Sequence, residues 1–202
     1  IPVIRACFDV TSTSHSESSR TRLHSRANPN TMEDTMTDQS NARGHGVVMQ
    51  PDEGPTFWQP VPANGHVESK LFPANTHFDG LSMGYQTIAP RSRVREHSHG
   101  EQIEMLVGIR GKGRVNLDGV GHDMVPGTVC FAGYDVKHEI INESDDEDLV
   151  MMWVISPAGL ENFFESIGRS RTRGDAAPEP FARPESVVTI ERDMGMNDTT
   201  AQ

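Results

Sequence analysis

The sequence predicts an all-β domain, in which about eight short strands form a sandwich or a barrel. Two observations carry this prediction. Short apolar or alternating stretches recur at regular intervals between residues 67 and 157. Turn residues separate these stretches, most clearly Asp118 followed by Gly119, which is a strong hairpin signal.

The predicted strands are all short and are bounded by turn residues. In chain order they lie at residues 67–72, 81–88, 97–99, 104–109, 114–117, 120–124, 128–131, 138–142 and 149–155. Before them, residues 49–66 are rich in Pro and Gly and contain Phe57 and Trp58, which indicates an ordered arm that packs an aromatic side chain against a sheet. After them, Leu160, Phe163, Phe164 and Ile167 have helical spacing, and Gly168 is a plausible stop for a short helix that covers the barrel or packs on a dimer partner.

The two ends of the chain differ in composition from its centre. Residues 1–48 are rich in Ser, Thr, Asn and Arg with little apolar periodicity, and we expect them to be disordered. Part of this segment, up to about residue 35, is expected to be an added extension or an over-extended gene start. Residues 49–168 form the predicted domain, and residues 169–202 are expected to be a loosely ordered extension with a helical turn near residues 185–191.

The net charge of −11 lies almost wholly on the predicted domain, since residues 49–168 contain 8 basic and 18 acidic residues. This balance argues against a partner that is a nucleic acid or an anionic membrane surface. No apolar run approaches the roughly 18 residues of a membrane-spanning helix. The two cysteines, Cys7 and Cys130, provide no disulfide framework, which fits a reducing, cytoplasmic location.

Four residues in the centre of the chain are candidate metal ligands. His97 and His99 are two residues apart, so on a strand they project from one face. Glu104 and His138 each open another apolar stretch, so a common site can form where these strands begin. Imidazoles and a carboxylate that face one pocket suit Fe, Mn, Ni, Cu or Zn. Glu101 is the rival carboxylate, interpreted here as facing solvent or supporting the ligands.

The same residues resemble two sequence motifs of the cupin superfamily. His97, His99, Glu104 and Gly111 match every spacing of the first motif. His138 and Asn142 match the last half of the second motif, whereas Gly133 and Asp135 stand where Pro and Gly are usual. Because Asp tolerates the left-handed conformation that Gly normally provides, we expect the turn at Asp135 to be preserved.

The resemblance covers about residues 67–157 and implies a double-stranded β-helix, the cupin jelly-roll barrel. It also implies a mononuclear metal site in which His97, His99, Glu104 and His138 bind one divalent transition metal per chain, with Fe(II) favoured. Similarity to small cupins of the quercetin-dioxygenase-like group leads us to expect a homodimeric dioxygenase acting on a small phenolic, enol or diketone-like substrate. The alternatives are a non-redox isomerase, lyase or decarboxylase, and a non-catalytic cupin that only binds a small molecule.

Several other side chains are weaker candidates. Arg95 and Arg110 can supply a cation for an anionic substrate, although solvated surface charge is the default interpretation. Met83, Tyr85, Met151 and Trp153 are candidates for the barrel interior, since they lie on predicted strands. Cys130 is expected to be a small buried apolar residue rather than a nucleophile.

Overall fold

The computed structural model describes residues 44–197 of the chain. Most of the predicted N-terminal tail, including the part up to about residue 35 that is expected to be an extension, lies outside the described residues, as do residues 198–202. The described part of that tail, residues 44–48, is exposed and has no regular secondary structure beyond one turn.

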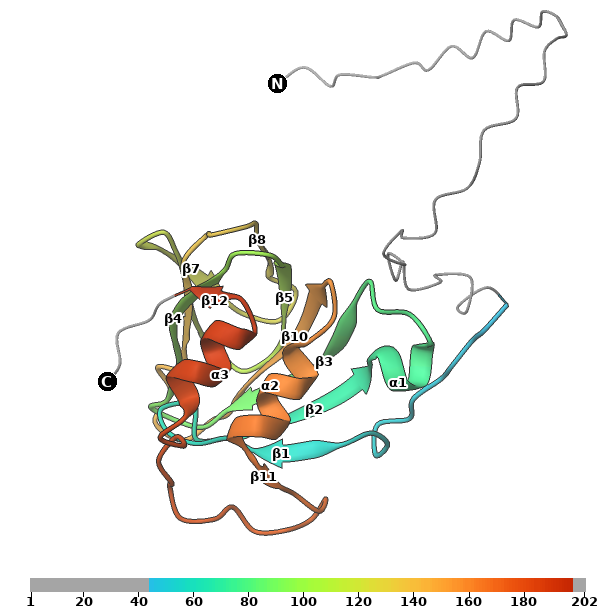
Figure 1. Ribbon diagram of the computed structural model, residues 1–202. Coiled ribbons are helices and arrows are strands. Elements are labelled where there is room, and N and C mark those ends of the chain that lie inside the picture. The colour runs from blue at the N-terminus through green and yellow to red at the C-terminus, as the bar shows by residue number, and fades with distance from the viewer. Residues whose placement is uncertain (1–43, 198–202) are drawn as a thin grey trace, which may run out of the picture. The chain divides into compact units, whose positions relative to one another are not determined.

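Two antiparallel sheets make up the domain (Figure 1). The larger sheet has seven strands in the order β11 (Arg169–Ser170), β1 (Thr56–Trp58), β2 (His66–Leu71), β3 (Ser82–Ile88), β10 (Leu149–Ser156), β5 (Ile103–Arg110) and β8 (Val129–Ala132). The smaller sheet has five strands in the order β12 (Met196–Asn197), β4 (Arg93–His99), β9 (His138–Ile141), β6 (Gly113–Leu117) and β7 (Val120–Met124).

The hydrophobic core lies between the two sheets. Leu106 and Trp153 of the larger sheet and Val115, Met124 and Ile140 of the smaller sheet belong to one buried cluster, each with at most 1% of its surface exposed. Strand β10 shows why the sequence folds this way, since its residues alternate between buried and half-buried along its whole length. The arrangement confirms the predicted all-β class and the double-stranded β-helix.

The pairing of β3 with β10 decides which of the four candidate interior residues face inward. Met151 lies opposite Gln86 and Trp153 lies opposite Gly84, and all four residues are buried. Met83 and Tyr85 alternate with them along β3 and therefore project from the other face, where they are half-buried. The prediction that Met83 and Tyr85 line the interior was wrong, because strand parity gives two faces but not which one is buried.

Within residues 44–197, three short helices accompany the sheets: α1 (Pro73–Thr76), α2 (Leu160–Ile167) and α3 (Val187–Asp193). Helix α2 is the predicted helix, and its Phe164 ring packs against Trp153 with ring centroids 5.5 Å apart. No helix in the described part of the chain is long and apolar enough to cross a membrane.

The segment after Gly168 takes part in both sheets. Strand β11 pairs with β1 at one end of the larger sheet, and β12 pairs with β4 at one end of the smaller sheet. Between them, Val187, Ile190 and Met194 around helix α3 pack against the buried core. Residues 169–202 were expected to be a loosely ordered extension, and these contacts with the sheets and the core were not predicted. Through these contacts, α3 and β12 lie beside strand β4, which carries two of the candidate ligands (Figure 1).

Candidate metal centre

The four candidate ligands come from three strands that belong to both sheets. His97 and His99 lie at the end of β4, and His138 opens β9, directly opposite His97 in the register. Glu104 is the second residue of β5, in the larger sheet. The site therefore lies between the sheets, and His99, His138 and Glu104 are 1%, 1% and 4% exposed.

The structure brings these side chains together closely enough to share one ion. One potential ligand atom from each residue lies within 4.8 Å of the others. Glu104 Oε2 is 2.8 Å from His138 Nε2 and 3.4 Å from His99 Nε2. Donors that bind one transition metal at about 2.0–2.2 Å are at most about 4.4 Å apart, so only small side-chain adjustments separate this cluster from a coordination sphere.

Backbone carbonyl groups fix the orientation of two of the imidazole rings. The carbonyl oxygen of Arg95 is 2.8 Å from His97 Nδ1, and that of Val136 is 3.0 Å from His138 Nδ1. Since a carbonyl oxygen only accepts, Nδ1 donates in both cases, and a neutral ring then carries its lone pair on Nε2. Metal-binding histidines are commonly held in this way.

His99 provides a separate test of whether the site fits a metal ion. Its ring is almost completely buried, yet neither of its nitrogen atoms has a hydrogen-bond partner among the described residues. Buried polar atoms normally have a partner, since leaving one without a partner costs about 1–3 kcal/mol. A metal ion among the four donors supplies that partner, so the residues present fit such an ion.

The electrostatics of the cluster favour the charge states that bind metals. Burial alone would raise the pKa of Glu104, but the hydrogen bond from His138 and the proximity of His99 outweigh burial and lower this pKa far below its usual range. Burial, together with the nearby His138 and His99, holds the pKa of His97 well below its usual value. Glu104 is therefore an anion and His97 is neutral near neutral pH.

His138 differs from His97 because it pairs directly with the carboxylate. Burial acts to lower the pKa of His138, but the hydrogen bond to Glu104 and the charge of Glu104 raise it overall. When no metal is bound, the 2.8 Å contact between His138 Nε2 and the Glu104 carboxylate requires a proton between these two atoms. A metal ion that binds both residues replaces this proton, which links metal binding to proton release.

Residues 84–155, which include all four candidate ligands, match the family model described as Cupin domain. This part of the chain therefore resembles a cupin domain. Protein SchB of Streptomyces halstedii is 31% identical to the chain over 91 residues, which are 43% of this chain and 66% of that protein. The chain thus spans just under two thirds of the length of that relative.

Solved structures match parts of the chain at low sequence identity. KdgF from Halomonas sp. is 16% identical, with a TM-score of 0.49, and the match covers 58% of this chain and 99% of that chain. A predicted oxalate decarboxylase from Thermotoga maritima is 23% identical, with a TM-score of 0.47, and the match covers 55% of this chain and 99% of that one.

The turn at the altered half of the second cupin motif keeps its expected backbone. Asp135 has a φ of 60°, in the left-handed region where the motif usually has Gly. Its backbone N–H donates to the carbonyl of His99 at 2.9 Å, and its side chain accepts a hydrogen bond from Asn197 at 2.8 Å. Asn142, the last motif residue, is buried and donates to the carbonyls of Ile88, Ala89 and Glu147, so it holds the end of β3 and the loop before β10 together.

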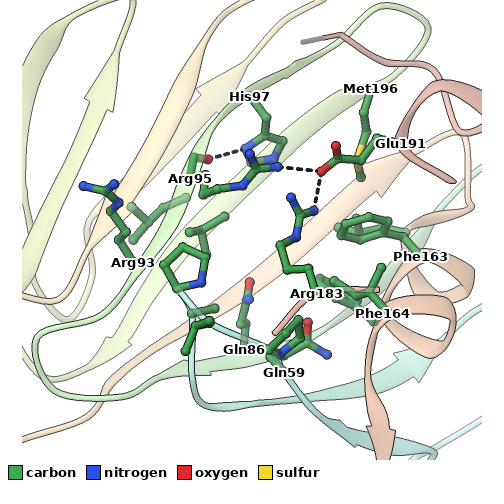
Figure 2. Close-up of a pocket in the computed structure, with 18 of the residues that line it drawn as sticks. Gln59, Gln86, Arg93, Arg95, His97, Phe163, Phe164, Arg183, Glu191 and Met196 are labelled. Atoms are coloured by element: carbon green, nitrogen blue, oxygen red, sulfur yellow. Dashed lines mark hydrogen bonds and ion pairs between the residues drawn. The ribbon is translucent and has the colours of Figure 1, made fainter. Parts of the chain in front are cut away.

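A cavity of about 370 Å³ adjoins the four candidate ligands, and His97 and Glu104 belong to its lining. Its apolar wall comes from α2, through Leu160, Phe163, Phe164 and Ile167, and from the core residues Val94, Ile140 and Met151. The polar residues that line the cavity include Gln59, Gln86 and several arginines (Figure 2). Ligand pockets in proteins commonly combine an apolar lining with a few placed polar groups.

The remaining candidate residues from the sequence differ in their position and exposure. Arg95 lines the pocket, whereas the Arg110 side chain is 70% exposed and lies 3.8 Å from Asp148. Glu101 is exposed, as expected for the rival carboxylate. Cys130 is buried, and burial together with the nearby charge of Glu104 raises the pKa of its thiol, so it is not primed as a nucleophile.

The sequence reasoning missed the pocket residues of the C-terminal segment, chiefly Arg183, Glu191 and Met196. The signal that could have found them is the spacing of Val187, Ile190 and Met194, which marks one apolar helix face. Gln59 was also missed, because the arm before the first predicted strand gave no polar pattern.

Proposed function

We propose that the cupin domain binds one divalent transition metal ion through His97, His99, Glu104 and His138, and that it acts on a small organic substrate in the adjoining cavity. The observation that carries this proposal is the cluster of four donor atoms within 4.8 Å of one another at the wall of that cavity, in which three of the residues are buried and His97 is half-buried. When bound, such an ion polarises a chelating oxygen atom, and a redox-active ion also activates dioxygen.

Within this proposal the chain's own residues have distinct tasks. The carbonyls of Arg95 and Val136 hold the two rings in the orientation that presents Nε2. The apolar side chains of α2 exclude water from the space beside the donors, which strengthens electrostatic interactions with a substrate. Four protein ligands leave two positions of a six-coordinate ion for the substrate and a second small molecule.

Our proposal for the reaction is a dioxygenase that uses Fe(II) and a phenolic, enol or diketone-like substrate. An apolar cavity that opens directly onto a nitrogen-rich donor set supports it, since both an aromatic body and dioxygen partition into apolar surroundings. Non-redox chemistry, as in an isomerase, lyase or decarboxylase, uses the same site without dioxygen and is distinguished by experiment.

The test is elemental analysis of the purified full chain, followed by anaerobic loading with Fe(II), Mn, Ni, Cu or Zn and an oxygen-uptake screen. About one metal ion per chain, with uptake that requires a redox-active metal, is the expected result. Turnover under argon with Zn or Mn would instead indicate non-redox chemistry, and the dioxygenase proposal would be wrong. Metal binding without any turnover identifies a binding protein, and a chain that takes up none of the metals refutes the metal centre. The predicted homodimer is tested separately by light scattering.

A further inference from the structure

A second polar cluster lines the cavity, formed by Arg95, Arg183 and Glu191 (Figure 2). Arg95 lies on β4, two residues before His97, while Glu191 is on α3 and Arg183 is in the segment before that helix. Nη2 of Arg95 is 2.8 Å from Oε1 of Glu191, and Arg183 bonds to the same oxygen atom. The three side chains are 13%, 17% and 14% exposed, so the cluster is largely shielded from solvent.

The charge of the cavity is opposite to that of the whole chain. The chain has a net charge of −11, yet the cavity lining contains four arginines and two glutamates, of which Glu104 belongs to the metal centre. The arginines are Arg93, Arg95, Arg183 and Arg192. A cationic cleft with apolar walls in an acidic protein selects anions, because the low dielectric strengthens the local field.

Arg183 has the capacity to bind such an anion. Among the residues that the structure describes, its guanidinium has one hydrogen-bond partner, Glu191. A guanidinium has five N–H donors in a planar fork that matches the two oxygen atoms of a carboxylate. Arg183 therefore keeps N–H donors that its bond to Glu191 does not use.

A neutral donor lines the same cavity. This donor is the side-chain amide of Gln59, which is 3% exposed and whose Nε2 has no hydrogen-bond partner among the described residues. A buried amide N–H without a partner is unfavourable by about 1–3 kcal/mol, which a ligand oxygen atom relieves. Figure 2 places Gln59 among the labelled lining residues together with Gln86, which is also buried.

We infer that the substrate of this cavity is an organic acid, with a compact apolar or aromatic body and one carboxylate. The carboxylate binds Arg183 and the neighbouring Arg95, a neutral oxygen atom accepts from Gln59, and the body packs on Phe163 and Phe164 of α2. The inference rests on the proposed function only in that both place the ligand in the same cavity. It specifies the substrate class, which the metal centre alone does not.

The experiment is isothermal titration calorimetry of the full chain as purified, with its metal content measured on the same sample. The probes are matched pairs that differ in charge but hardly in shape: benzoate and benzamide, phenylacetate and phenylacetamide, cinnamate and cinnamamide. At least one carboxylate should bind at least about tenfold more tightly than its amide, and added salt should reduce this difference.

Variants of Arg183 assign the effect to the cluster. Arg183→Met should weaken carboxylate binding by about tenfold or more and leave amide binding unchanged, while Arg183→Lys should retain part of the preference because it keeps the charge but loses the fork. Arg110→Met, which removes an exposed arginine outside the cavity, is the matched control and should bind like the original chain. If Arg183→Met fails to fold, Arg183→Lys and the salt dependence decide the question.

Three results overturn the inference: amides that bind as tightly as the acids, an unchanged carboxylate affinity in Arg183→Met, or no binding by any carboxylate of the panel. Failure of the proposed metal site is detected by the metal analysis and not by the calorimetry. A chain without metal that still prefers the acids refutes only the metal centre, and a metal-loaded chain that does not prefer them refutes only the organic-acid ligand.

Discussion

Glu104 and His138 come from different sheets and meet with Oε2 and Nε2 2.8 Å apart in the buried interior. The contact joins β5 of the larger sheet to β9 of the smaller sheet, 34 positions further along the chain. A buried carboxylate and imidazole hold each other in place, and they do so with His97 and His99 beside them. The relationship is therefore both a link between sheets and half of the proposed metal centre.

Replacing one of these imidazoles should remove the metal without unfolding the domain. For His99→Ala and His138→Ala we expect metal content to fall at least about tenfold, because the remaining three donors no longer complete the site. Both variants should still fold, since neither histidine belongs to the apolar core cluster. His138→Ala should be the less stable of the two, because it leaves the buried Glu104 carboxylate without its partner. Elemental analysis measures the metal, and circular dichroism checks the fold.

His122→Ala is the matched control, because His122 is exposed on β7 and distant in sequence from the four donors. It should bind as much metal as the original chain. Retention of stoichiometric metal by both His99→Ala and His138→Ala would show that the ligands have been assigned wrongly.

The sequence predicted the part of the site that depends on local spacing. His97 and His99 share a face because residues two apart on a strand always do, and Glu104 and His138 open the strands that the apolar pattern marks. The conformation at Asp135 was equally predictable, since few residue types other than Gly tolerate a φ of 60°.

The ligand cavity was not predictable, because it depends on contacts between distant segments. Arg95 and Glu191 are 96 residues apart, and nothing local to either residue indicates the other. Met83 and Tyr85 were misplaced for a related reason. Their face is fixed by the register of β3 on β10, where Gln86 lies opposite Met151, and single-strand parity does not contain that register.

Lys70 anchors the arm that precedes the first strands, and its removal should destabilise the domain. Its side chain is 6% exposed, and Nζ donates to the carbonyls of Gln50, Pro51 and Glu53 at 3.2, 2.8 and 2.7 Å. In Lys70→Met these acceptors lose a charged donor, so we expect the free energy of unfolding to fall by about 2–3 kcal/mol. Urea denaturation measures this change.

Lys112→Met, in the exposed turn after Gly111, is the control and should change stability by less than about 0.5 kcal/mol. Equal stabilities of the Lys70 and Lys112 variants would mean that the three carbonyl contacts contribute nothing to folding.

Glu68 should make the domain less stable in acid. Burial acts to raise the pKa of Glu68, but hydrogen bonds and charges from Lys70 and Arg173 lower it overall from the usual 4.5. Because the folded-state pKa is below the unfolded one, this stabilisation is fully present above about pH 4.5 and is lost as the pH falls through the folded-state pKa. Glu68→Gln should therefore lose less stability than the original chain between about pH 5 and pH 3.

Urea denaturation at a series of pH values measures this difference. Glu165→Gln, which changes an exposed residue of α2, is the matched control and should follow the original chain. A Glu68→Gln variant whose stability falls with pH in parallel with the original chain contradicts the prediction.

Asp135 should tolerate Gly but not a β-branched residue. Its φ of 60° costs most residues about 1–2 kcal/mol, and a side chain branched at Cβ is the least tolerant. Asp135→Gly relieves the backbone cost but loses the hydrogen bond from Asn197, so its free energy of unfolding should stay within about 0.5 kcal/mol of the original. Asp135→Val keeps the strain and loses the same bond, and should be less stable than the Gly variant by about 1–2 kcal/mol.

The Gly variant is thus the control for the lost bond, and urea denaturation of both variants at pH 7 isolates the backbone effect. Equal stability of the two would mean that the turn has left the conformation which gives the His99 carbonyl its partner.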